Sequence, residues 1–244
     1  MPRPPGLSPP SARIAHGRSP AAELVAQLVA SFREQVRRAL AFDLDGSIAS
    51  LAVVDHYLAQ ARGEQREPIL SLLAAGAGAY VGDLVCNELG AQWIGDRDEP
   101  RRLRLLLRHH FLFLAPVDQA YEAILGETPD LGDPRLPRGA VLDTSFHLQT
   151  TPEVYDPDSP SSDDARDDAQ NRAHEQSDAD WVHDQLAHRP PLPEHEFYSM
   201  TGRFETLQLI VELLSARRAA QGRAPRVYAI EDYLRGIAEA STSE

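Results

Sequence analysis

The chain has 244 residues, 42% of them hydrophobic, and a formal net charge of −13, so it can bury a full core as one domain or two small ones. All 24 basic residues are arginine, which excludes chemistry that needs a Schiff-base lysine or a phosphate-loop lysine. The acidic charge argues against a nucleic-acid partner, and the single cysteine, Cys86, excludes internal disulfides and cysteine-rich zinc sites.

No apolar run reaches the roughly 18 residues of a membrane span, because Gly76, Gly78, Asp83 and Glu88 interrupt the best candidate. The N-terminus carries arginines without the apolar segment of a secretory signal. We therefore expect a cytoplasmic protein with no membrane partner. Residues 1–18 are rich in proline and predict a disordered tail.

Two helices are expected after this tail. Ser19 can cap a helix that has Pro20 at its first position and extends to about Phe42. Its apolar face at helical spacing comprises Leu24, Leu28, Phe32, Val36 and Leu40. A turn at residues 45–47 then leads into a second helix that ends at Gly63.

Residues 68–96 allow two interpretations. In the first, Gly76, Gly78 and Gly82 form the phosphate turn between a strand and a helix, with Asp96 about 20 residues downstream to bind a ribose. However, the third glycine falls one residue late for this fingerprint, and the preceding leucines and alanines are strong helix formers. We therefore favour the second interpretation, a single long buried helix.

In that helix, Gly78 and Gly82 share one face with Ala74 and Cys86, so a neighbouring helix could approach this face closely. Gly76 faces about 200° away from Gly78. We accordingly expect Gly82→Leu to be severely destabilising and Gly76→Ala to be mild.

The long helix is expected to end at Gly90, in a left-handed cap. Residues 103–114 are typical of a hairpin or one bent strand, although residues 101–107 could also start a helix. A short helix over residues 116–125 and a strand within residues 141–148 complete the pattern. The sequence thus predicts an α+β core over residues 19–149 with a small, mostly antiparallel sheet.

Residues 150–190 predict a disordered acidic insert. The segment from Asp156 to Asp184 contains ten acidic residues and two arginines, which gives a net charge of −8. Its apolar content is too low to offset the entropy of ordering. Residues 191–244 predict a C-terminal helical segment that packs on the core. It contains a long amphipathic helix over residues 194–218 and a last helix from about residue 230.

Histidine is the residue type most suited to chemistry here, but its arrangement is unfavourable. His109 and His110 are adjacent, so they diverge on a strand and on a helix alike. No H-E-x-x-H, G-x-S-x-G or lysine-bearing glycine loop occurs. We therefore predict no catalytic residue, no cofactor and no metal site.

The segments SLAVVD at residues 50–55 and GAYVGD at residues 78–83, followed by Trp93, resemble a pattern in small bacterial proteins of the domain-of-unknown-function kind. In those proteins an S-L-x-x-x-D helix precedes a G-A-Y-x-G-[DE] helix and a short strand that carries tryptophan. The resemblance covers residues 42–126. It implies an α+β fold and carries no established reaction.

These observations favour a non-enzymatic, soluble bacterial protein that acts by binding a protein partner. The residues expected to form its interaction surface are Asp55, Tyr80, Asp83 and Trp93. The alternative hypothesis is a nucleotide-binding enzyme that uses a glycine turn at residues 76–82.

Overall fold

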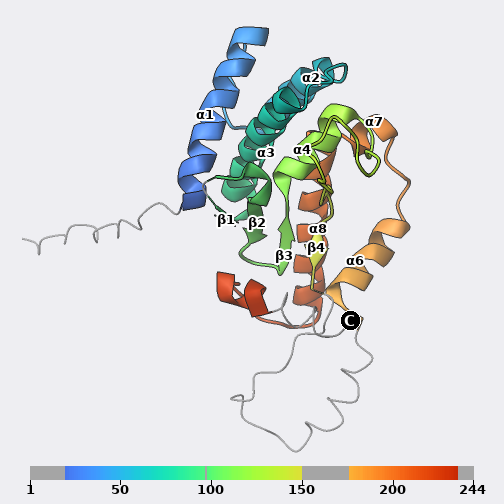
Figure 1. The fold of residues 1–244 in the computed structure, drawn as a ribbon. Helices are drawn as coiled ribbons and strands as arrows, with labels where there is room; N and C mark the ends of the chain where they lie inside the picture. The colour runs from blue at the N-terminus through green and yellow to red at the C-terminus, as the bar shows by residue number, and fades with distance from the viewer. Residues whose placement is uncertain (1–19, 97, 150–175, 236–244) are drawn as a thin grey trace, which may run out of the picture.

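The computed structural model describes residues 20–96, 98–149 and 176–235 (Figure 1). Helices pack around a four-stranded antiparallel sheet, which confirms the predicted α+β class. The predicted tail at residues 1–18 lies outside the described residues, and so do residues 150–175 of the predicted acidic insert.

The N-terminal half of the chain forms α1 (Pro20–Leu40), the short 3-10 helix η1 (Ile48–Ser50), α2 (Leu51–Gln60) and α3 (Glu67–Leu89). Helix α1 ends slightly earlier than expected, because Ala41 takes a φ of +52° that no right-handed helix can continue. Its buried face is also rotated, since Val25 and Val29 are buried whereas Leu24 and Leu28 are only half-buried.

Helix α3 confirms the helical interpretation of residues 68–89, and Gly90 caps it in the left-handed conformation, with φ at +70°. Residues 76–82 lie within this helix, so the strand and glycine turn of the alternative interpretation are wrong. By length and composition α3 could cross a membrane, but 67% of its most apolar window is buried inside the fold. It lies between α1 and α4 as the central helix of the core (Figure 1).

Helix α4 (Pro116–Leu125) forms where predicted and ends at Gly126, in the left-handed conformation. It begins against Gly78 of α3, where a Cβ atom would lie only 2.6 Å from the Val117 Cα and 2.7 Å from the Pro116 carbonyl oxygen. The contact is therefore between two backbones, and any side chain at this position would separate the helices.

The other two glycines of α3 face different elements. A Cβ atom on Gly82 would lie 2.2 Å from the Trp93 ring, and one on Gly76 would lie 2.9 Å from the side chain of Phe32 in α1. Phe32 is fully buried and cannot move away cheaply. The expectation that Gly76→Ala is mild is therefore wrong.

All ten residues of α4 are buried, including three polar ones. Glu122 forms an ion pair with Arg203, and the Gln119 amide donates to the Thr144 carbonyl oxygen at 3.1 Å. Asp118 binds Arg101 at 2.9 Å. Because each buried polar group has a partner, α4 can be surrounded on every side.

The sheet contains β1 (Ala91–Ile94), β2 (Arg104–Leu107), β3 (Leu112–Leu114) and β4 (His147–Leu148), in that order, and each neighbouring pair is antiparallel. The hairpin interpretation of residues 103–114 is thus confirmed, while the helical one is wrong. The 3-10 turn η2 (Pro100–Arg102) precedes the hairpin and contains only the first two residues of the segment 101–107 that could have started a helix. The strands place a row of leucines in the main core: Leu105, Leu107, Leu112 and Leu114.

The outer face of the sheet is covered by residues 224–235. Tyr228 and Tyr233 pack there against Leu106 in a second, smaller core. The Tyr233 hydroxyl accepts from the Leu112 amide at 3.1 Å and lies 2.6 Å from the Leu107 carbonyl oxygen, so it satisfies the turn between β2 and β3. Residues 230–235 are helical, as predicted for the start of the last helix.

The C-terminal part contains α6 (Asp178–Ala187), α7 (Glu194–Phe197) and α8 (Met200–Ala220). Helix α6 lies inside the range predicted to be disordered, and that prediction is wrong for residues 178–187. Ser177 caps the helix, Val182 is buried, and Arg217 of α8 pairs with Asp178 at 2.7 Å. A few apolar and paired residues thus order a segment whose overall composition is acidic.

The single helix predicted over residues 194–218 is in fact two helices. Ser199 starts α8 as its N-cap and accepts from the Gly202 amide at 2.8 Å. A Cβ atom on Gly202 would lie 2.1 Å from the Glu196 carbonyl oxygen. The chain therefore folds back over the first turn of α8, and only glycine leaves room for it.

We predict that Gly78→Ala destabilises the protein by about 3 kcal/mol or more, because the methyl group would force α3 and α4 apart along their backbones. Gly63→Ala is the matched control, since a Cβ atom there meets nothing within 4 Å. Urea unfolding of both variants measures the difference. Equal and small losses would contradict the backbone contact.

Stability should also depend on His110, which is buried in the β2–β3 turn and hydrogen-bonds to Ser215 at 3.0 Å. Burial, and to a lesser extent the charge of Arg218, lowers its pKa from 6.5 to about 4. The folded protein thus keeps His110 neutral while the unfolded chain takes up a proton. The stability that neutral His110 gives the folded protein is complete above pH 6.5. It is lost as the pH falls toward 4, and the free energy of unfolding decreases by up to about 3 kcal/mol.

Urea unfolding between pH 7.5 and pH 4 checks this dependence. His110→Gln should lose less stability on acidification than the natural protein, because it removes the titrating group and keeps a donor for Ser215. His109→Gln is the control, since His109 is the exposed neighbour. Parallel pH profiles for His110→Gln and the natural protein would refute the assignment.

Candidate functional site

A groove of about 630 Å³ runs along α1. Its apolar surface consists of Val25 and Val29 of α1, Leu44 of the following loop and Trp93 of β1. The remaining lining residues are Ala22, Ala26, Ala30, Arg33, Glu34, Arg37, Asp43 and Asp83. An apolar base with charged residues around it is the composition expected of a binding surface.

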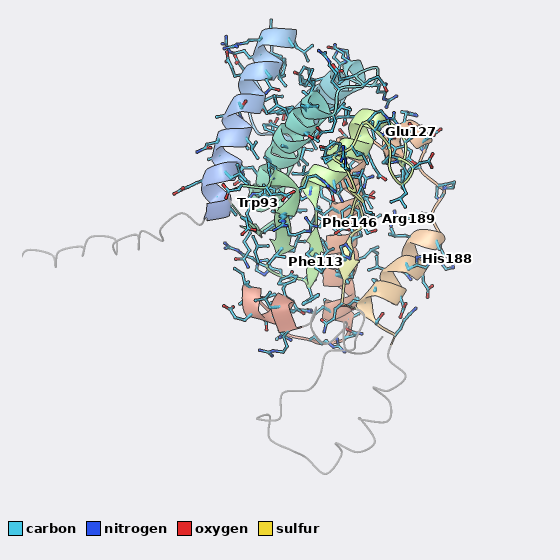
Figure 2. The ribbon with its side chains drawn as sticks, in the orientation of Figure 1. Trp93, Phe113, Glu127, Phe146, His188 and Arg189 are labelled. Carbon is cyan, nitrogen blue, oxygen red and sulfur yellow. The ribbon has the colours of Figure 1, made fainter. Side chains whose placement is uncertain are left out.

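Two packed helices hold the walls of the groove. Helix α1 is fixed on α3 through Phe32, which lies over Gly76, and through the buried Val36. On the other side, Trp93 lies on Gly82, so its indole position depends on a glycine in α3. Figure 2 shows Trp93 beside the lower part of α1. The site is therefore built mainly on α1, α3 and β1, with Asp43 and Leu44 contributed by the loop that follows α1.

Trp93 is half-buried, and its indole nitrogen Nε1 is enclosed without a hydrogen-bond partner among the described residues. A buried indole usually donates to a partner. The position of the Trp93 side chain therefore depends on the packing of its ring against Gly82 rather than on a hydrogen bond.

The charges in the groove are of two kinds. Arg37 and Glu34 pair with one another at 2.8 Å, and the hydrogen bonds from Arg37 and Arg38 lower the pKa of Glu34. Asp83, by contrast, makes no hydrogen bond or ion pair within the described part of the chain, and neither does Asp43. Arg33 makes no ion pair there, although hydrogen bonds from Ser47 and, to a lesser extent, the charge of Arg33 lower the pKa of Asp45. Arg33 and Asp83 therefore carry opposite charges that no ion pair among the described residues neutralises.

Asp83 and Arg33 lie at different levels of the groove. Helices α1 and α3 run in opposite directions (Figure 1), and Gly76 of α3 lies against Phe32, the neighbour of Arg33. Asp83 follows Gly76 by seven residues, about 10 Å further along α3. Asp83 therefore lies toward the N-terminal half of α1 and Arg33 toward its C-terminal half, where Glu34, Arg37 and Asp43 also line the groove.

Of the four residues predicted to form the interaction surface, the structure brings Asp83 and Trp93 together in this groove. The prediction for Tyr80 is wrong, because its side chain is only 2% exposed. Its hydroxyl group binds Ser50 Oγ at 2.6 Å and accepts from the Gly46 amide at 2.9 Å. The ring of Tyr80 also lies 5.5 Å beneath the Arg33 guanidinium, so it supports the groove from inside.

Asp55 lies away from the groove and has a structural role. Its carboxylate on α2 accepts hydrogen bonds from the Met200 amide at 2.7 Å and from the Thr201 amide at 3.1 Å. These are free donors at the start of α8, where a negative charge is also favourable. Asp55 therefore joins α2 to α8, and its prediction as part of an interaction surface is wrong.

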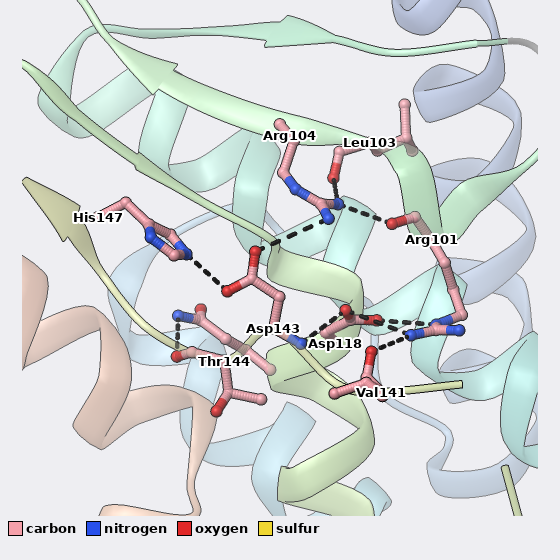
Figure 3. A network of polar contacts seen from close by, with 9 residues as sticks. Arg101, Leu103, Arg104, Asp118, Val141, Asp143, Thr144 and His147 are labelled. Atoms are coloured by element: carbon pink, nitrogen blue, oxygen red, sulfur yellow. Dashed lines mark hydrogen bonds and ion pairs between the residues drawn. The ribbon is translucent and has the colours of Figure 1, made fainter. Parts of the chain in front are cut away.

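A second polar cluster lies around Asp118 and Asp143 (Figure 3). Asp118 accepts from the Asp143 amide at 2.9 Å, and Arg101 also donates to the Val141 carbonyl oxygen at 2.9 Å. His147 binds Asp143 at 2.6 Å, and this hydrogen bond lowers the pKa of the Asp143 carboxyl group.

This Asp143–His147 pair superficially resembles a catalytic dyad. However, within the described ranges no serine, threonine or cysteine side chain hydrogen-bonds to His147, and its ring is stacked on Phe113 at 4.5 Å. Asp118 and Arg101 are used to hold residues 141–143 against α4. The cluster therefore anchors the long connection between α4 and β4.

A reactive thiol and a metal site are also not supported by the described residues. Burial raises the pKa of the Cys86 thiol to about 12, so it is not a reactive thiolate. Among residues 20–96, 98–149 and 176–235, no group of three or more histidine, cysteine or acidic side chains could hold a metal ion.

Sequence reasoning missed the part of the groove that α1 contributes. The signal was present, because Ala22, Ala26 and Ala30 recur every four residues and are followed on the same side by Arg33 and Arg37. The periodicity of the larger apolar residues in this helix indicates only the face that packs on the core.

We predict that Asp55→Ala lowers the free energy of unfolding by about 1.5 to 3 kcal/mol, because two amides at the start of α8 lose a charged acceptor. His56→Ala on the same helix removes an exposed side chain and should be nearly neutral. Thermal unfolding compares the two variants. An equally small effect of both would show that Asp55 does not hold α8.

No protein-family model, curated protein or solved structure matches this chain. The groove and its charges are therefore the basis for the function proposed below.

Proposed function

We propose that this chain is a non-enzymatic, soluble bacterial protein of the cytoplasm that binds a protein partner in the groove along α1. The observation that carries the proposal is the combination of an apolar base with charged side chains, Arg33 and Asp83 among them, that form no ion pair within the described residues. An apolar base supplies affinity, while charges at separate levels fix the direction in which a ligand lies.

The shape of the groove favours a helical ligand. From Ala22 to Arg37 it follows α1 for about 22 Å, or four turns. A helix laid alongside α1 would bury its apolar side on Val25, Val29 and Trp93. This is the groove-binding mode in which residues at positions i, i+3, i+4 and i+7 make the contacts.

A nucleotide is a poorer match. Residues 76–82 are inside α3, where helical hydrogen bonds use their amides, so no glycine turn offers donors to phosphate. Asp83 would also repel an anion from the Trp93 end of the groove. These features weigh against the nucleotide-binding enzyme as an alternative.

The test is a capture experiment in the organism that makes the protein. An Ala26→Arg variant places a long charged side chain in the groove, and we expect it to lose a partner that the natural protein retains. Gln27→Arg is the control, because Gln27 is an exposed neighbour that does not line the groove.

Circular dichroism should first show that both variants keep the natural helix content. Quantitative mass spectrometry then compares the proteins recovered with each form. Recovery of the same proteins with Ala26→Arg and with the natural chain would contradict the proposal.

A further inference from the structure

The charges of Arg33 and Asp83, neither of which forms an ion pair within the described residues, bear on the identity of the partner. Arg33 and Asp83 have opposite signs and are displaced from each other by about 10 Å along α1. A surface of this kind matches a copy of itself in the opposite orientation, because each cation then meets an anion.

The uncharged part of the groove allows such a copy to come close. Ala22, Ala26 and Ala30 lie on one side of α1, and the last two are exposed. Alanine leaves the backbone near the surface, so two α1 helices could pack at the short end of the usual interaxial range of 8–10 Å. Long arginines at either end could then reach across to the opposite molecule.

We propose that the occupant of the groove is a second copy of this chain, bound antiparallel with a two-fold axis near residues 26–30 of α1. Arg33 of each copy then pairs with Asp83 of the other. This inference rests on the proposed function, since it names the partner of the same groove.

A second copy explains the charges better than an unrelated helix does. An unrelated partner needs its own acidic group for Arg33 and its own basic group for Asp83, at the correct spacing. A second copy supplies both groups from the same two residues. The two-fold arrangement also repeats each contact, so that one favourable pair becomes two.

Charge reversal tests the pairing directly. Sedimentation or light scattering, at about 1 to 100 µM protein, should give the natural chain twice its monomer mass of 26.9 kDa. Arg33→Glu and Asp83→Arg should each be monomeric, because each brings like charges together. An equimolar mixture of the two variants should recover the doubled mass, since Glu at position 33 then faces Arg at position 83.

Two variants control for general effects of charge. Gln27→Glu adds a charge at an exposed position of α1, and Glu88→Arg reverses an exposed charge of α3, both outside the groove. Both should remain dimeric. If Asp83→Arg does not fold, Asp83→Asn and Arg33→Gln serve in its place, and each should shift the dimer equilibrium toward monomer.

A natural chain that is monomeric throughout this range would overturn the inference, and so would a dimer that neither reversal affects. If the chain is monomeric while Ala26→Arg still loses a captured partner, the groove binds another protein and the proposed function stands alone. Recovery of the dimer in the mixed variants supports the pairing of Arg33 with Asp83.

Discussion

The backbone contact between α3 and α4 at Gly78 is the constraint on which this structure depends. Because α3 touches the start of α4 without an intervening side chain, α4 lies in the centre of the molecule and all of its residues are buried. Every polar group on α4 must then find a partner. Those partners come from α8, from η2 and from the connection that leads to β4, so one glycine contact positions much of the C-terminal half.

The same helix also determines the groove. Gly76 leaves room for the side chain of Phe32 and thereby positions α1. Gly82 leaves room for the ring of Trp93 and thereby positions β1. The three glycines of α3 therefore do not form one face for a single neighbouring helix, as their spacing suggested. Each of them contacts a different element. The groove is the space that remains between two elements positioned by different glycines of one helix.

Much of the fold could be predicted because it is encoded locally. The left-handed caps at Gly90 and Gly126 and the prolines near the starts of α3 and α4 mark those helices in the sequence. The break at Ser199 was missed because it depends on a contact between Gly202 and the preceding turn. Helix α6 was hidden by the acidic composition around it, although Ser177 is a good cap.

The candidate site was only half predictable. Helix α3 is apolar on nearly every side, so its sequence does not reveal that Tyr80 faces inward while Asp83 faces the groove. Asp55 looked like an exposed acid because its partners at the start of α8 lie about 145 residues away in the chain. Such assignments depend on tertiary packing, which periodicity within one helix does not encode.

The central claim is that a second copy of this chain docks beside Trp93, and fluorine NMR of 5-fluorotryptophan-labelled protein tests it most directly. The chain has two tryptophans, and Trp181 lies on α6, packed against Arg217 of α8 and away from the groove. Docking of a second copy should shift the Trp93 signal as the protein concentration rises, while the Trp181 signal stays constant. A shift of Trp181 alone, or no shift of either signal, would contradict it.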